Sequence, residues 1–143
     1  MRRLFTVLAL LWLAPASAQS ELPGLSPSEA HALHQAGEIV LIDIRQPEEW
    51  RQTGVAEGAI QVSMNHPDGG EGFVRDVLQA VDNDTDAPVV VICRTGNRTS
   101  QLVPALRQLG FSRVYHVPQG MVGNASGSGW IDTDLPVEDC TAC

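Results

Sequence analysis

The sequence predicts a single α/β domain with a mainly parallel central sheet of about five strands and helices on both faces. Two continuous runs of β-branched and apolar residues, 39–42 and 88–92, are typical of strands buried on both faces of a parallel sheet. Strand-like and helix-like segments alternate along the chain, which favours the same architecture. The 143 residues, 43% of them hydrophobic, are enough for one domain.

The first half of the chain contains two expected helices and two expected strands. Residues 26–29, Ser-Pro-Ser-Glu, form a capping box in which serine and glutamate each bind a free backbone N–H. This helix should run to about Ala36. The strand at 39–42 follows, then a short helix from Pro47 to Trp50 with two acidic residues at its positive end, and a short strand from Ala59 to Ser63.

The second half continues the alternation. Phe73, Val77, Leu78 and Val81 stand at helical spacing, which predicts a helix over 72–81. The buried strand 88–92, a helix over 99–109 and a strand over 113–117 come next. Residues 119–129 are rich in glycine and serine and should form a loop. Pro104 falls inside the last helix, where proline removes a hydrogen bond.

The first 18 residues have the layout of a secretory signal peptide. A basic start is followed by the apolar run 4–13 and by Ala16-Ser17-Ala18, a small-residue cleavage site. The apolar run is half the length of about 20 residues that a membrane span needs. We therefore expect cleavage after Ala18, export to the periplasm or outside the cell, and no membrane span in the mature chain. The remainder divides into a linker (19–25), the domain (26–137) and a tail (138–143).

Charge excludes two classes of function. The chain has 9 basic residues, all arginine, against 17 acidic ones, for a net charge of −8. A nucleic-acid surface needs clustered basic residues, so no nucleic-acid partner is expected. A P-loop is excluded because its lysine is missing.

The residues that carry chemistry follow the buried strand 88–92. Cys93 ends this strand, and Arg94-Thr95-Gly96-Asn97-Arg98 lead into the next helix. Backbone N–H groups at a strand-to-helix turn converge on one point and, with the helix dipole, hold anionic atoms. Such a field favours the thiolate, which is the nucleophilic form of cysteine. We therefore expect Cys93 to be a nucleophile rather than a structural thiol.

Several motifs together resemble the rhodanese family of sulfurtransferases. The resembling segments are 41–45 with 48–50, 54–60, 93–98, 110–115, 120–121, 129–130 and 135–137. Val55 stands where the family usually has histidine, and residues 122–128 resemble an insertion. The resemblance implies a rhodanese-like fold and transfer of sulfane sulfur through a Cys93 persulfide.

The resemblance also implies roles for neighbouring residues and partners. Residues 94–98 would bind the substrate. Asp43 would help to hold their loop, through Arg98 or backbone N–H groups, and Arg45 would be structural. The donor would be a small sulfur-containing anion such as thiosulfate, and the acceptor a thiol or cyanide-like group, with a protein thiol as one option. No metal or cofactor is expected.

Two other functions use similar residues. Cysteine-based phosphatases carry Cys-x5-Arg, whose arginine clamps a phosphoryl group, whereas Cys93 and Arg98 are separated by four residues. The tighter loop suits one added sulfur atom better than phosphate, and arsenate reduction is disfavoured in the same way. A sulfur carrier or anion-binding module without turnover is the remaining alternative.

The tail ends in Cys140-Thr141-Ala142-Cys143. This pair could be a local disulfide, a resolving pair for a Cys93 persulfide, or half of a metal site. A zinc site would need two further ligands. A disulfide is the simplest interpretation in an oxidising compartment, and it leaves Cys93 as the free thiol.

Overall fold

The structure is a computed structural model that describes residues 23–141 and 143. The predicted signal peptide (1–18) and most of the predicted linker lie outside the described residues. None of the helices in the described part of the chain is long and apolar enough to cross a membrane.

A four-stranded parallel sheet forms the centre of the domain. Its strands are β1 (Val40–Asp43), β3 (Ile60–Gln61), β4 (Val89–Ile92) and β5 (Val114–His116), in the order β3-β1-β4-β5. The predicted fold class is confirmed, but the described sheet has four strands where about five were expected. At its edge, within the described residues, Gly24 makes a single parallel bridge to His116.

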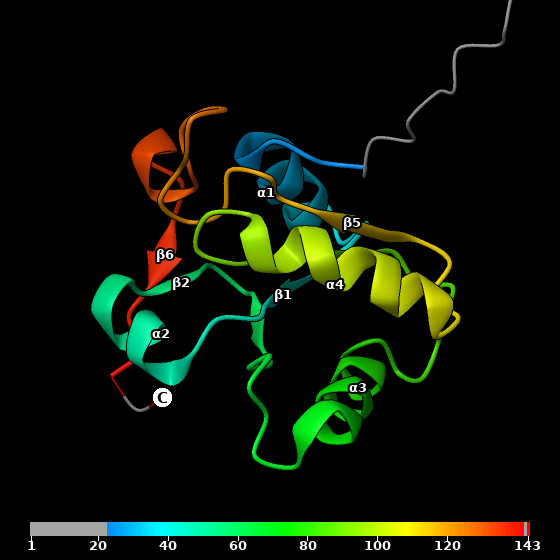
Figure 1. Ribbon diagram of the computed structural model, residues 1–143. Coiled ribbons are helices and arrows are strands. Elements are labelled where there is room, and N and C mark those ends of the chain that lie inside the picture. Colours follow the sequence, from blue (N-terminus) through cyan, green and yellow to red (C-terminus); the bar gives the residue numbers. More distant parts are fainter. Residues whose placement is uncertain (1–22, 142) are drawn as a thin grey trace, which may run out of the picture.

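Helices cover both faces of this sheet, as Figure 1 shows. They are α1 (Pro27–Gln35), α2 (Pro47–Thr53), α3 (Gly69–Ala80) and α4 (Asn97–Gln108). Side chains alternate along each strand, so Val89 and Val91 pack with α3 and α4, while Val90 and Ile92 pack toward α1 and the C-terminal segment. Both faces are thus buried, as the apolar runs predicted.

Pro104 lies within α4 without ending it. Its side chain is exposed, so the helix carbonyl that loses an N–H partner lies on the solvent side of the helix. The sequence alone did not explain this proline. Its place on the exposed face does.

The C-terminal segment returns to the domain and pairs with it. After a 3-10 turn (Ile131–Thr133), β6 (Val137–Glu138) pairs antiparallel with β2 (Val55–Ala56). Trp130 is fully buried, and its indole N–H donates to the Pro136 carbonyl at 2.9 Å. Neither short strand was predicted, since two residues are too few to show a periodic pattern.

Candidate active site

Cys93 lies at the carboxyl end of β4, where the chain turns into α4. Its side chain is 1% exposed and is the one free thiol among the described residues. The Gly96 N–H donates to its sulfur at 3.2 Å, and the Thr99 hydroxyl oxygen lies 3.7 Å away. A backbone donor aimed at the sulfur stabilises negative charge on it. The arrangement therefore fits a nucleophile.

The loop after Cys93 offers further donors. The backbone N–H groups of Arg94, Thr95, Asn97 and Arg98 have no hydrogen-bond partner within the described part of the chain. Those of Asn97 and Arg98 belong to the first turn of α4, which lacks intrahelical acceptors and carries the positive end of the helix dipole. This loop can therefore hold a small anion or a negatively charged sulfur adduct.

The loop needs glycine at position 96. Gly96 has φ 86°, in the left-handed region that glycine adopts readily. A Cβ atom there would overlap the carbonyl oxygen of Pro118. The close approach of residue 118 leaves room for no other side chain.

Segment 118–124 supports the loop from the other side. The Met121 N–H donates to the Cys93 carbonyl at 2.9 Å, and the Val122 N–H donates to the Arg94 carbonyl at 3.0 Å. The Asn124 amide donates at 2.8 Å to both the Thr95 and the Pro118 carbonyls. The residues predicted as a glycine- and serine-rich insertion therefore help to fix the backbone around Cys93.

Arg98 does not point to Asp43 but to Glu49 on α2. Its guanidinium makes two hydrogen bonds to the Glu49 carboxylate, at 2.6 and 2.7 Å. The two side chains are 32% and 17% exposed. Hydrogen bonding to Arg98 holds the pKa of Glu49 below its ordinary value. From the sequence alone, Glu49 is only an acidic residue at a helix start and within a family motif.

We expect Glu49→Gln to lower the free energy of unfolding at neutral pH by about 1–3 kcal/mol, between the values typical of exposed and buried pairs. A carboxyl whose pKa is lowered by folding stabilises the fold at pH values above its ordinary, unfolded pKa. This contribution is lost as the pH falls through the folded pKa. The difference between wild type and variant should therefore shrink below pH 4.5, the ordinary value for glutamate. Urea unfolding at several pH values measures it.

Glu48→Gln is the matched control, because Glu48 is 66% exposed and forms a surface ion pair with Arg51. It should change stability by less than about 1 kcal/mol. Equal effects of the two variants would contradict the importance of the Glu49–Arg98 pair.

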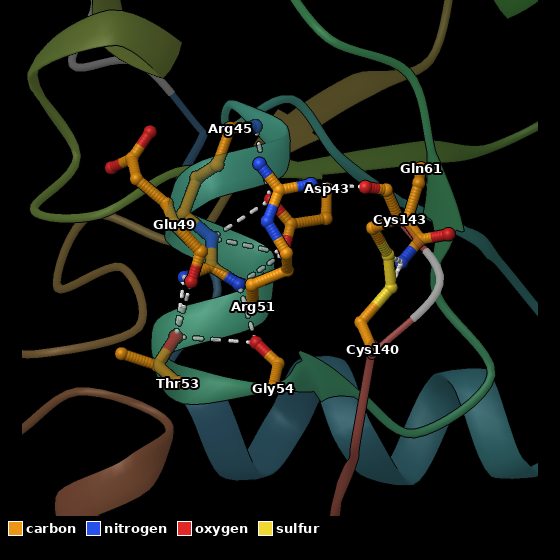
Figure 2. Close-up of a disulfide and its surroundings, with 9 residues drawn as sticks. All are labelled: Asp43, Arg45, Glu49, Arg51, Thr53, Gly54, Gln61, Cys140 and Cys143. Carbon is orange, nitrogen blue, oxygen red and sulfur yellow. Dashed lines mark hydrogen bonds and ion pairs between the residues drawn. A yellow bond between two sulfur atoms is a disulfide. The ribbon is translucent and has the colours of Figure 1, made fainter.

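Asp43 and Arg45 form a buried pair beneath the site. Asp43 is fully buried and Arg45 is 1% exposed, with 2.7 Å between Oδ2 and Nη2. The contact of Asp43 with Arg98 that the resemblance implied is replaced by this pair. Arg45 also donates to Thr53 and to the Gly54 carbonyl, at 2.7 and 2.8 Å, as Figure 2 shows. The pair therefore fixes α2, and α2 in turn presents Glu49 to Arg98.

Thr99 and His116 are buried next to the nucleophile, and the sequence analysis assigned neither of them a role. The Thr99 hydroxyl lies 3.0 Å from Nδ1 of His116 and also donates to the Gly96 carbonyl at 3.0 Å. Burial lowers the pKa of His116. The sequence alone gives His116 no role, because sequence distance hides that the ends of β4 and β5 are neighbours.

The tail forms the disulfide that the sequence analysis considered. Cys140 and Cys143 are joined, with their Cα atoms 5.5 Å apart. Figure 2 shows the disulfide beside Gln61, whose amide lies 2.8 and 3.1 Å from the two sulfur atoms. Arg51 on α2 binds the Cys143 carbonyl. No group of three metal-binding side chains occurs among the residues that the structure describes.

Truncation after Asp139 should leave turnover with small thiol acceptors within about twofold of wild type, because the nucleophile and the backbone donors around it lie within 93–98. The measurement separates sulfur loading from sulfur release in single-turnover experiments. Normal loading with slow release by the truncated chain would instead identify the tail as a resolving pair.

The family model for the rhodanese-like domain matches residues 26–126. Among curated proteins, the thiosulfate sulfurtransferase GlpE of Pseudomonas fluorescens is 31% identical over 105 residues, which cover 71% of this chain and 83% of that protein.

Solved structures agree with these matches. The polysulfide-sulfur transferase of Wolinella succinogenes has 29% identity and a TM-score of 0.61, covering 85% of this chain and 81% of the other. The protein Rv0390 of M. tuberculosis has 26% identity and a TM-score of 0.64, covering 85% and 100%.

Proposed function

Because this chain belongs to the rhodanese family, we propose that it transfers sulfane sulfur from a donor such as thiosulfate to a thiophilic acceptor. The carrier is a persulfide on Cys93. The observation that supports this most strongly is the position of the Cys93 sulfur. It lies 3.2 Å from the Gly96 N–H, at the start of a loop whose other backbone N–H groups have no partner among the described residues.

The reaction has two steps. In the first, the Cys93 sulfur attacks the outer sulfur of thiosulfate, the sulfur–sulfur bond of the donor breaks, and its electron pair leaves with sulfite. In the second, the acceptor attacks the outer sulfur of the persulfide, and Cys93 leaves as a thiolate. The loop N–H groups stabilise the negative charge that the outer sulfur carries between these steps.

The contacts of Arg98 disfavour a phosphatase. A phosphatase arginine must be free to clamp the phosphoryl group through both nitrogens, whereas both terminal nitrogens of Arg98 bind Glu49. Together with the short spacing from Cys93, this pairing favours sulfur transfer over phosphate or arsenate chemistry.

We further propose that the protein acts after export, with the signal peptide removed after Ala18. The support is the tripartite pattern of residues 1–18. The tail disulfide is compatible with an oxidising compartment. In that compartment the sulfur acceptor could be the thiol of another protein or a small molecule.

Intact mass spectrometry after treatment with thiosulfate tests the proposal. We expect the mass to increase by one sulfur atom on Cys93 and to return to its starting value when cyanide or a thiol is added. A protein that gains sulfur but does not lose it to cyanide or a thiol would instead be a sulfur carrier without turnover. A protein that gains no sulfur from thiosulfate or polysulfide would contradict the proposal.

Arg94→Ala should raise the apparent KM for anionic donors by about tenfold, the effect of losing roughly 1.4 kcal/mol of binding, with little change in kcat. Arg94 is exposed and lies in the loop whose N–H groups have no partner in the described part of the chain, so its charge should attract the donor. Steady-state kinetics with thiosulfate measure it. Arg113→Ala removes an exposed arginine just before β5, at the opposite end of the sheet, and should leave KM unchanged. Equal KM values for the two variants would exclude Arg94 from donor binding.

A further inference from the structure

Three buried side chains form a continuous hydrogen-bonded line that starts at the nucleophile. Cys93 is 1% exposed, Thr99 fully buried and His116 5% exposed. The sulfur and the Thr99 hydroxyl are 3.7 Å apart, and that hydroxyl is 3.0 Å from Nδ1 of His116. Three polar groups in a row are unusual inside an apolar core, where each polar group needs a partner.

The far end of this line leads toward the surface. Nε2 of His116 has no hydrogen-bond partner among the described residues, and 5% of the residue's surface is exposed. It faces Gly24, where a Cβ atom would lie 3.9 Å from it. The ring of Pro118 fills the place beside Gly24, at 2.5 Å from such a Cβ atom, so proton exchange with water depends on the 5% of His116 that stays exposed.

We propose that His116 is the general base of the sulfur-transfer reaction and that it acts on Cys93 through the hydroxyl of Thr99. This proposal rests on the sulfurtransferase function proposed above and adds the route of the proton. His116 touches neither the sulfur nor the donor, so its role depends on Thr99.

The protons balance in both steps. As Cys93 attacks the donor, its thiol proton passes to the Thr99 oxygen, and the Thr99 proton passes to Nδ1 of His116. Nε2 then releases a proton to water and leaves a neutral ring. When the acceptor later removes the outer sulfur, the same groups can return a proton to the departing Cys93 thiolate.

The chemistry of the three groups fits this direction. A hydroxyl both donates and accepts, and the Thr99 proton has two acceptors in reach, Nδ1 of His116 and the Gly96 carbonyl. Burial favours the uncharged form of His116, and in the tautomer that carries its proton on Nε2 the Nδ1 atom is an acceptor. The charged ring formed in the step is disfavoured there and gives up its proton again.

Four variants of the full chain test the route. Thr99→Val removes the hydroxyl at constant shape, and Thr99→Ser restores it. His116→Asn keeps a hydrogen-bonding group near Thr99 that cannot accept a proton. His34→Asn is the matched control on α1, away from the site. Thermal unfolding first establishes that each variant folds.

The readout is the rate of sulfur loading from thiosulfate in single-turnover mass measurements. We expect Thr99→Val and His116→Asn to slow sulfur loading by at least about tenfold. A general base usually contributes about 100-fold or more. Thr99→Ser should recover most of the loss, and His34→Asn should match wild type. Loading by His116→Asn at the wild-type rate would overturn the proposal, because a hydrogen bond alone would then suffice.

Alkylation of Cys93 by iodoacetamide separates this proposal from the proposed function, because it needs no sulfur donor. We expect alkylation to be slow in Thr99→Val and His116→Asn, and close to the wild-type rate in Thr99→Ser and His34→Asn. A wild-type protein that gains no sulfur, together with slowed alkylation of His116→Asn, would contradict sulfur transfer but not the proton route. Normal loading by wild type with equal rates for all variants would contradict only the proton route.

Discussion

Cys93→Ser is expected to reduce sulfur loading and sulfur transfer below detection while leaving the protein folded. A serine hydroxyl is not ionised at neutral pH and cannot carry sulfane sulfur as a persulfide. The swap is nearly isosteric, so the free energy of unfolding should change by no more than about 1–2 kcal/mol at this buried position. Mass measurements after thiosulfate treatment and urea unfolding check the two parts.

The double variant Cys140→Ser, Cys143→Ser is the matched control, since it also replaces thiol sulfur by oxygen but only in the tail. It should still load one sulfur atom. Sulfur transfer by Cys93→Ser at a rate comparable to wild type would overturn the assignment of the nucleophile.

The largest loss of stability is expected for Arg45→Leu. The substitution leaves the carboxylate of Asp43 fully buried without its partner, and breaking a buried pair from one side costs about 3–5 kcal/mol. It also removes the hydrogen bonds from Arg45 to Thr53 and to the Gly54 carbonyl. Urea unfolding should show this loss as a lower midpoint with little change in slope.

The double variant Asp43→Asn, Arg45→Leu shows whether the loss comes from the unpaired charge. An amide is cheaper to bury than a carboxylate, so the double variant should be more stable than Arg45→Leu alone. A cost below about 1 kcal/mol for the single variant would mean that the pair contributes no more than an exposed one.

The parts of the fold that could be predicted are those with a local physical signal. The apolar runs 39–42 and 88–92 identified β1 and β4, and the capping box at 26–29 is formed, with Ser26 and Glu29 bonded to each other's backbone. The loop 93–98 could be predicted because a cysteine stands between an expected strand and an expected helix. Each of these signals lies within about ten residues, the reach of sequence periodicity.

What could not be predicted depends on contacts between distant residues. β2 and β6 are two residues each and exist only because residues 55–56 meet 137–138. The partner of Arg98 was missed because Glu49 is 49 residues away, and several other carboxylates were equally plausible. His116 lies beside Thr99 only because β4 and β5 are adjacent in the sheet.

The segment 122–128 has a consequence for how this surface can change during evolution. An exposed run of glycine and serine ordinarily tolerates deletions. Here a deletion that reached Asn124 would free the carbonyls of Thr95 and Pro118 at once. Such a deletion would lie in an exposed loop, yet it would change the backbone around the reactive sulfur of Cys93. In this protein, loop length and nucleophile geometry are therefore coupled through Asn124.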